Sequence, residues 1–430
     1  MKDGDITHSS LDFMCPRCAR LESRNPFCAA CADALLGAWA KWLILVATAL
    51  LPFAILLAIH VFESKAGLDT WMYIIFFPTG FALFGMWVFV KTKKPRISVL
   101  VVALLGWLLI RGTFGRLGLG WPEMVRLTCM AGIMLMAAHS NWHPRGLFLV
   151  ITATVVGEML MIWPFQIIWQ HNPAVNTPDH NMIGGLTGTF SNENRLTTYF
   201  LVALPISFMV YITERDARWV FAGLFGVLAS TAILVLNGSR VGVYLVAPVL
   251  AMCYIGATRI YCLSKTRLAV LTALLVVMAV VGWKYQGDSV RQITKQPLSI
   301  RLDKARSLEW GLSWQMIDAH WPTGVGPGRW HLVATRLGKP IYEHPHNEFL
   351  QCFAEYGLPG LILCAWIVAI ILKTGLKSPF LFAIVGAMLL QGTVHGMRTP
   401  EQSFYFALIS GIILRNYTYK PGGNHARIPQ

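Results

Sequence analysis

The segment Tyr342–Gln351, with the sequence YEHPHNEFLQ, holds the densest group of side chains that could do chemistry. It contains two histidines, His344 and His346, followed by Asn347 and Glu348 just before a long apolar run. An imidazole has an unperturbed pKa of about 6.5, so either histidine could accept a proton near neutral pH. The same residues also suit a packed loop and a helix start, because Asn is a good N-cap and Glu favours the first turn.

Several arginines stand at the ends of apolar runs and could bind an anion together. Arg195 ends GTFSNENR, Arg240 ends LNGSR, and Arg301 and Arg306 lie in one polar segment. Each alone can be an anchor that reaches towards the membrane surface. Together, beside the histidines, they indicate a phosphate site, because guanidinium groups bind phosphate oxygens in pairs. Paired carboxylates for Mg²⁺ are missing from the polar loops, so arginines would neutralise the phosphate charge.

The elements that position these residues are predicted to be membrane-spanning helices. The chain has 430 residues, of which 55% are hydrophobic and 13% charged, with a mean hydropathy of +0.54. A soluble domain has about 25% charged residues, and a spanning helix needs about 20 apolar residues. We therefore predict an all-α polytopic membrane protein with about twelve transmembrane helices. They are expected at Ala40–Phe62, Trp71–Val90, Ile97–Ile110, Met124–Ala138, Leu147–Trp169, Leu196–Ile212, Trp219–Leu236, Val241–Ala257, Leu268–Trp283, Glu348–Leu372, Phe380–Val394 and Ser403–Leu414.

Basic segments predict the orientation of these spans. KTKKPR, ERDAR, RIYCLSKTR, KTGLK and RNYTYK fall on one side, which the positive-inside rule assigns to the cytoplasm with both termini. The net charge of +15 is explained by these loops and by anionic membrane lipid, so no nucleic-acid partner is expected. The expected divisions are a cytoplasmic segment 1–38, a transmembrane domain 39–415 and a cytoplasmic tail 416–430. No cleavable signal peptide is predicted, because the first apolar run starts late.

A large loop, 284–347, is predicted on the opposite side, between spans nine and ten. Apolar residues at three- and four-residue spacing predict a helix in it. They are Leu302, Ala305, Leu308, Leu312, Met316 and Ala319. Trp310, Trp314 and Trp321 suit a membrane interface, and WPTGVGPG should end the helix. The ordinary alternative is an amphipathic helix that only covers the bundle.

Four segments in order resemble the O-antigen ligase and O-antigen polymerase superfamily. They are GTFSNEN (Gly188–Asn194), NGSR (Asn237–Arg240), RSLEWGLSWQMIDAHWPTGVGPG (Arg306–Gly328) and HPHNEFLQCFAEYGLPGL (His344–Leu361). The resemblance covers roughly Gly188 to Leu372. It implies a glycosyltransferase of GT-C-like architecture in the bacterial inner membrane. Such an enzyme transfers a glycan from undecaprenyl diphosphate to an acceptor on the periplasmic face, without a cofactor or metal for catalysis.

The resemblance also suggests roles for individual residues. Arg240 and Arg306 would stabilise the leaving diphosphate, and His346 would accept the acceptor's proton in an inverting displacement. The expected substrate-binding residues, for the diphosphate or the glycan, are Arg195, Arg301, His344, Asn194 and Asn347.

The family leaves the acceptor open. Twelve spans with the main loop before the tenth favour ligation to the lipid A core in lipopolysaccharide biosynthesis. A polymerase that extends another lipid-linked repeat and a protein O-oligosaccharyltransferase are alternatives. From another class, a transporter or flippase for lipid-linked sugars could use the same arginines, but it predicts inverted repeats that the sequence does not show. An inactive relative that serves as a scaffold is a further alternative.

Two CxxC pairs near the N-terminus, CPRC and CAAC, predict a structural metal site. Cys15, Cys18, Cys28 and Cys31 suit tetrahedral Zn²⁺, with iron or a redox pair as alternatives. The predicted cytoplasmic location disfavours disulfides there. On that side, the zinc knuckle would serve docking or regulation. The remaining cysteines, at positions 129, 253, 262, 352 and 364, are interpreted as packing residues.

Overall fold

The computed structural model describes most of the chain, and its described residues form helices and no strand. The described residues are 29–50, 76–87, 95–113, 121–139, 144–163, 193–236, 239–260, 265–295, 304–338, 340, 344–392 and 399–415. The helices are α1 (Ala29–Leu50), an unlabelled helix at Phe76–Trp87, α4 (Pro95–Thr113), α5 (Trp121–His139), α6 (Arg145–Met161), α7 (Glu193–Thr213), α8 (Ala217–Leu236), α9 (Arg240–Ile260), α10 (Lys265–Lys295), α11 (Lys304–His320), α12 (Trp330–Leu337), α13 (Glu348–Gly375), α14 (Pro379–Gly392) and α15 (Pro400–Leu414).

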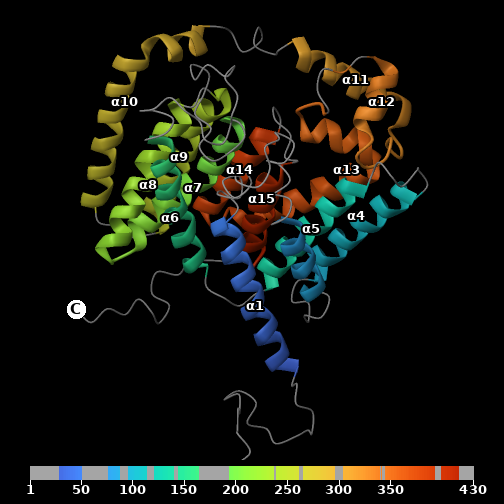
Figure 1. Cartoon of the computed structure of the whole chain (residues 1–430), viewed down its shortest axis with the longest axis horizontal. Helices are drawn as coiled ribbons and strands as arrows, with labels where there is room; N and C mark the ends of the chain where they lie inside the picture. Colours follow the sequence, from blue (N-terminus) through green and yellow to red (C-terminus); the bar gives the residue numbers. More distant parts are fainter. Residues whose placement is uncertain are drawn as a thin grey trace, which may run out of the picture.

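Helix α7 forms the centre of the bundle. The most apolar 18-residue window of Asn194–Thr213 is 94% buried, and α6, α8, α9, α14 and α15 pack around this helix. A second group consists of α4, α5 and α13, and α15 contacts both groups (Figure 1). Helix α13 faces outward along much of its length, with Ile362 and Trp366 more than half exposed. Large exposed apolar side chains on a helix of this length are expected where lipid replaces water.

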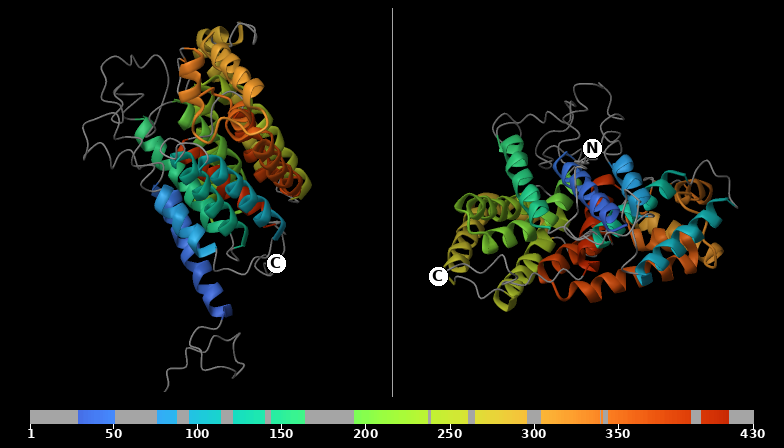
Figure 2. Two further views of the ribbon diagram at one scale, coloured as in Figure 1. Left: turned by 90° about the vertical axis from the view of Figure 1, so that its right-hand side faces the viewer. Right: turned by 90° about the horizontal axis from the view of Figure 1, so that it is seen from below.

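The two ends of the bundle carry different elements. Helices α11 and α12 lie together at one end, and the first residues of α1 lie at the opposite end (Figure 1). The left view in Figure 2 shows the same separation between α11 and α12 and the start of α1. The loop helix that we predicted from residue spacing is therefore confirmed as α11, and it lies away from the start of α1.

All twelve predicted spans coincide with a helix wherever the structure describes them. In the described residues, four helices are both long and apolar enough to cross a membrane. They are Asn194–Thr213, Ala217–Leu236, Val241–Thr258 and Glu348–Gly375. Five shorter apolar helices lie at other predicted positions, so the total of twelve crossings stays a prediction. Helix α10 continues to Lys295, which places its last turns inside the segment that we predicted as a loop.

The predicted continuous span at Glu348–Leu372 is bent in the structure. Gly357 has φ 68° and ψ −171°, a conformation that is open to glycine and costly for other residues. Its missing side chain is also required, because a Cβ there would lie 2.5 Å from the backbone nitrogen of Gly324. Pro359 follows and cannot donate a helical hydrogen bond. We call Glu348–Tyr356 the first arm of α13 and Leu358–Gly375 the second arm.

Candidate active site

The two histidines lie in a short turn that leads into the first arm of α13. Asn347 is the N-cap: its side-chain oxygen accepts hydrogen bonds from the backbone N–H groups of Phe349 and Leu350, both at 3.1 Å. The capping alternative for Asn347 is thus confirmed, whereas its contact with a substrate stays a prediction. The imidazole rings of His344 and His346 face one another, with centroids 4.4 Å apart.

His346 has an unusual backbone conformation. Its φ of 51° makes it the one non-glycine residue with a positive φ in the described part of the chain. The left-handed region costs a non-glycine residue roughly 1–2 kcal/mol, and surrounding contacts must compensate. Asn347 caps the helix on one side, and on the other the buried Pro345 accepts a hydrogen bond through its backbone oxygen. The structure therefore fixes the backbone at His346, which sets the direction in which its side chain leaves the turn.

That hydrogen bond comes from α11, the helix that carries Arg306. The indole nitrogen of Trp310 donates to the Pro345 oxygen at 2.9 Å. Arg306 lies one helical turn before Trp310 and is half-buried, so the two side chains share a face of α11. The structure thus brings the helix of Arg306 against the histidine turn. Trp314 and Trp321 are exposed as expected for a membrane interface, but Trp310 is not a simple interface anchor.

The buried face of α11 differs from the predicted apolar stripe. Leu312 and Met316 are buried, but Leu308 is 42% exposed, and the polar residues Glu309 and Ser313 are fully buried instead. The reason is a hydrogen bond between helices: the indole nitrogen of Trp330, in α12, donates to the Ser313 hydroxyl at 2.8 Å. A buried polar residue with a distant partner cannot be recognised from apolar spacing.

The segment Trp321–Arg329, which we call the glycine loop, joins α11 and α12 to the first arm of α13. The backbone oxygens of Ala354 and Glu355 accept from the N–H groups of Val325 and Gly326, at 2.8 and 2.9 Å. The carboxylate of Glu355 accepts from the N–H of Gly328 at 2.9 Å.

The same carboxylate accepts two further hydrogen bonds. One comes from the N–H of Trp330 at 3.1 Å, and the other from the side chain of Gln351 at 3.2 Å. Glu355 is fully buried, so these partners supply the stabilisation that water would otherwise give. Sequence reasoning missed this residue, although an acid inside a predicted span is a recognisable signal.

A second pair of segments meets at the start of α7 and α9. The Ser239 hydroxyl donates to the side-chain oxygen of Asn194 at 3.0 Å. Arg195 and Arg240 are the next residues in the chain, so the two predicted arginine motifs lie side by side at two helix starts. Arg195 is 8% exposed, and Arg240 is the first residue of α9. The position of Arg301 lies outside the described residues.

The first turn of α15 links this pair to the α13 side. Gln402 donates to the hydroxyl of Thr198, in α7, at 2.8 Å. The neighbouring Ser403 accepts from the guanidinium of Arg126, in α5, at 3.0 Å. Arg126 in turn lies 3.6 Å from the carboxylate of Glu348, the first residue of α13.

These contacts bring together the N-terminal ends of α5, α7, α9, α13 and α15. A helix N-terminus carries a partial positive charge and unsatisfied N–H groups, so this end of the bundle favours an anion.

Arg126 belongs to a buried network that sequence reasoning also missed. Its guanidinium contacts both carboxylate oxygens of Glu123, at 2.7 and 2.9 Å, and the Tyr356 hydroxyl donates to the same carboxylate. Glu123 and Arg126 are each 5% exposed. An acid and a base three residues apart at the start of an apolar run could have indicated it.

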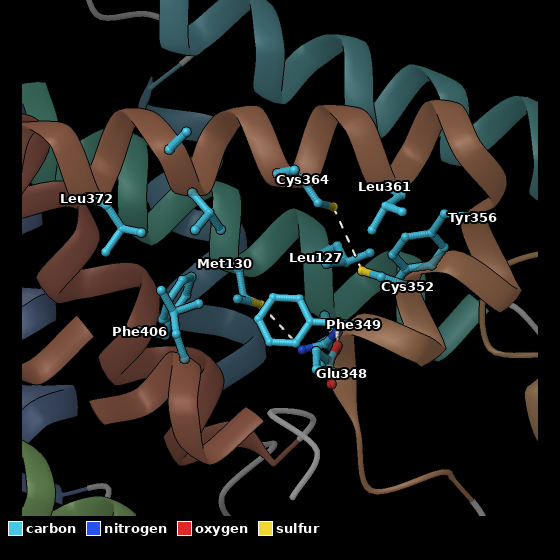
Figure 3. Close-up of a pocket in the computed structure, with 15 residues that line it drawn as sticks. Leu127, Met130, Glu348, Phe349, Cys352, Tyr356, Leu361, Cys364, Leu372 and Phe406 are labelled. Atoms are coloured by element: carbon cyan, nitrogen blue, oxygen red, sulfur yellow. Dashed lines mark hydrogen bonds and ion pairs between the residues drawn. The ribbon is translucent and has the colours of Figure 1, made fainter. Parts of the chain in front are cut away.

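Arg126 and Glu348 form the polar end of a cavity of about 340 Å³ between α13, α5, α14 and α15 (Figure 3). Apolar side chains such as Leu127, Val368 and Phe406 line the rest of it.

The predicted zinc site lies almost entirely outside the described residues. Cys15, Cys18 and Cys28 lie outside the described residues, and of Cys31 only the helical backbone in α1 is described. Among the described residues, no group of three or more His, Cys, Asp or Glu side chains could hold a metal ion.

Comparison with known proteins supports the resemblance found in the four motifs. Residues 225–365 match a family model described as O-Antigen ligase. The matched stretch runs from α8 into the second arm of α13 and includes Arg240, Arg306, His344 and His346, whereas Arg195 precedes it. This similarity supports a membrane enzyme that transfers glycosyl groups in the O-antigen pathway, and it does not distinguish ligation from polymerisation. A comparison with curated proteins found no match.

Proposed function

We propose that this protein transfers a glycan from undecaprenyl diphosphate to an acceptor hydroxyl at the periplasmic face of the bacterial inner membrane. The acceptor that we favour is the lipid A core, which makes the reaction an O-antigen ligation. A lipid tail keeps the reacting sugar carbon at the membrane surface, so the catalytic groups must lie where spans end. The observation that carries the proposal is the contact between Trp310 and Pro345, which joins the helix of Arg306 to the turn of His346.

The reaction proposed is an inverting displacement. The acceptor oxygen attacks the anomeric carbon, its proton passes to His346, and the bond from that carbon to the diphosphate oxygen breaks. The bond's electron pair leaves with undecaprenyl diphosphate. Arg240 and Arg306, with Arg195, Arg301 and the helix N-termini, would stabilise the negative charge that grows on the leaving group. Because guanidinium groups stay protonated at all relevant pH values, this role needs no metal ion.

The residues that we predicted to bind substrate are assigned separate roles at this site. His344 would orient His346 or contact phosphate, since the two rings face each other at 4.4 Å. The side-chain oxygen of Asn194 accepts the hydrogen bond from Ser239, so we propose that Asn194 acts by holding the starts of α7 and α9 together. The side-chain oxygen of Asn347 caps the helix, so we propose that its amide nitrogen donates a hydrogen bond to the glycan.

The test is a deletion strain examined by lipopolysaccharide electrophoresis and complemented with wild type, His346→Ala or Arg240→Ala. Core without attached polymer identifies a ligase, and core with a single repeat identifies a polymerase. Unchanged lipopolysaccharide with altered protein glycosylation identifies a protein oligosaccharyltransferase.

Loss of the base should slow transfer about 10²–10⁴-fold. Loss of one charge-stabilising group should slow it about 10²–10³-fold. Full transfer by both variants at normal expression would contradict the proposed mechanism. If the protein were a flippase, its variants would leave glycan transfer intact in detergent extracts. They would lose only the delivery of the donor across the membrane.

A further inference from the structure

The bend of α13 brings two cysteines together that are far apart along the chain. Cys352 lies in the first arm and Cys364 in the second, twelve residues later. In a straight α-helix these positions would lie about 18 Å apart along the axis. Their sulfur atoms are instead 3.8 Å apart, because the first arm folds back beside the second at Gly357. Both cysteines pack against the hydrophobic core as predicted, and the bend in addition places their sulfur atoms next to each other.

Both thiols are accessible from one side. Each is half-buried, and each lines the cavity of about 340 Å³ described above, where Figure 3 shows them facing one another across the bend. The other described free cysteines differ: Cys129 and Cys253 are fully buried, in α5 and α9. Among the described cysteines, Cys352 and Cys364 are thus the pair whose sulfur atoms are close together and whose thiols line a cavity.

We propose that Cys352 and Cys364 form a reversible disulfide site that fixes the angle between the two arms of α13. A disulfide has an S–S length of about 2.05 Å, so the two sulfur atoms, now 3.8 Å apart, must approach each other by about 1.8 Å. The oxidant is a small-molecule or protein disulfide. One cysteine thiolate attacks it and releases one thiol. The second thiolate then attacks the mixed disulfide and releases the other thiol. The two cysteine protons go to the released thiols, and two electrons pass to the oxidant.

The surrounding contacts favour bond formation without a large backbone movement. The N–H of Leu358, next to the bend, donates to the Trp321 oxygen at 2.9 Å. The Trp107 indole donates to the Tyr356 oxygen at 2.8 Å. The bend is therefore already held at an angle that keeps the sulfurs close, which reduces the entropy lost when the ring closes. In the orientation predicted above, this end of α13 lies outside the cytoplasm, where disulfides persist.

The bond would act on two features of the protein. It would join two residues that line the cavity, which would narrow the space between the arms. It would also fix the first arm, which begins at Glu348, two residues after His346. The site does not depend on the reaction proposed above, because it rests on the two sulfurs and the bend alone.

The experiment treats the full-length protein in membranes with oxidised glutathione, alkylates free thiols and digests with trypsin. The peptide Leu337–Lys373 contains both cysteines, so an internal disulfide removes two hydrogen atoms and blocks alkylation at both. Dithiothreitol should restore both alkylation sites. Cys253→Ser is the matched control and should keep the disulfide, whereas Cys352→Ser and Cys364→Ser should each lose it. A wild-type peptide with alkyl or glutathione groups on both cysteines would overturn the proposal.

A second measurement tests whether the bond stabilises the folded protein. The unfolding temperature of the oxidised wild type and of Cys253→Ser should exceed that of the reduced protein, because the cross-link restricts the unfolded chain. Cys364→Ser should unfold at the same temperature under both conditions. Equal unfolding temperatures for the oxidised and reduced wild type, with the disulfide formed, would show that the bond does not stabilise the bent helix and would overturn its proposed structural role.

Discussion

Glu355 holds the glycine loop against the first arm of α13, and Glu355→Gln tests how much that attachment contributes. The carboxylate accepts hydrogen bonds from the backbone N–H groups of Gly328 and Trp330 and from the side chain of Gln351. Glutamine has the same shape but keeps only one of the two carboxylate oxygens. Its NH₂ group replaces the other oxygen and would face a hydrogen-bond donor there. In either orientation at least one backbone N–H loses its partner.

The magnitude follows from those contacts. A hydrogen bond to a charged acceptor contributes about 1.5–3 kcal/mol, and a buried donor left unpaired adds its desolvation penalty. We expect Glu355→Gln to destabilise the protein by about 2–4 kcal/mol. Glycan transfer should fall as well, because α11 and α12, and with them Arg306, lose a point of attachment to the arm that follows His346.

The assay is thermal unfolding of the purified protein in detergent, followed by transfer activity under conditions where the variant is folded. Asp318→Asn is the matched control, since Asp318 is exposed on α11 and the same carboxylate-to-amide change should cost less than about 0.5 kcal/mol there. If Glu355→Gln unfolds at the same temperature as Asp318→Asn, the carboxylate does not hold the loop and the reasoning fails.

Three further predictions follow from other contacts. Trp310→Phe removes the 2.9 Å hydrogen bond to Pro345 and keeps an aromatic ring. Glycan transfer should therefore slow at least about tenfold, with a small change in unfolding temperature. Unchanged transfer would count against the link between α11 and the histidine turn. Arg126→Met leaves Glu123 buried without its ion-pair partner and should cost about 3–5 kcal/mol, measured by unfolding, with partial recovery in the double variant that adds Glu123→Gln. Cys15→Ser should release about one equivalent of zinc, measured by metal analysis, and keep some transfer activity; protein that contains no zinc before the substitution would disprove the knuckle.

Local patterns were enough to predict many of the elements. The four-residue spacing of Leu312 and Met316 contributed to the prediction of α11, and the Pro and Gly residues after Trp321 predicted where it ends. The N-cap at Asn347 was also readable, because a capping side chain bonds to N–H groups only two and three residues away. Each of these signals depends on neighbours within one or two helical turns.

Long-range contacts could not be predicted in the same way. Arg126 and Ser403 are 277 residues apart in sequence, and Trp310 and Pro345 are 35 apart. A single sequence holds no periodic signal for such pairs. The bend at Gly357 was missed for another reason: the apolar residues continue through it, so the run satisfies the length of a span whether the helix is straight or folded back. A Gly-x-Pro sequence shows that a helix can bend there, but the direction of the bend depends on the packing of Gly357 against Gly324.

The distribution of charge around Arg126 restricts where a diphosphate can bind. Arg126 lies between the carboxylates of Glu123, at 2.7 Å, and Glu348, at 3.6 Å, so two negative groups surround one positive group. A diphosphate would have to displace a buried carboxylate to reach it, and the carboxylate would then lose its own partner. Arg126 therefore stabilises the junction of α5, α13 and α15 and does not compete for the anion. Under the proposed mechanism, the diphosphate must lie near the starts of α7 and α9 and near Arg306, because the two carboxylates beside Arg126 disfavour it at that end of the cavity.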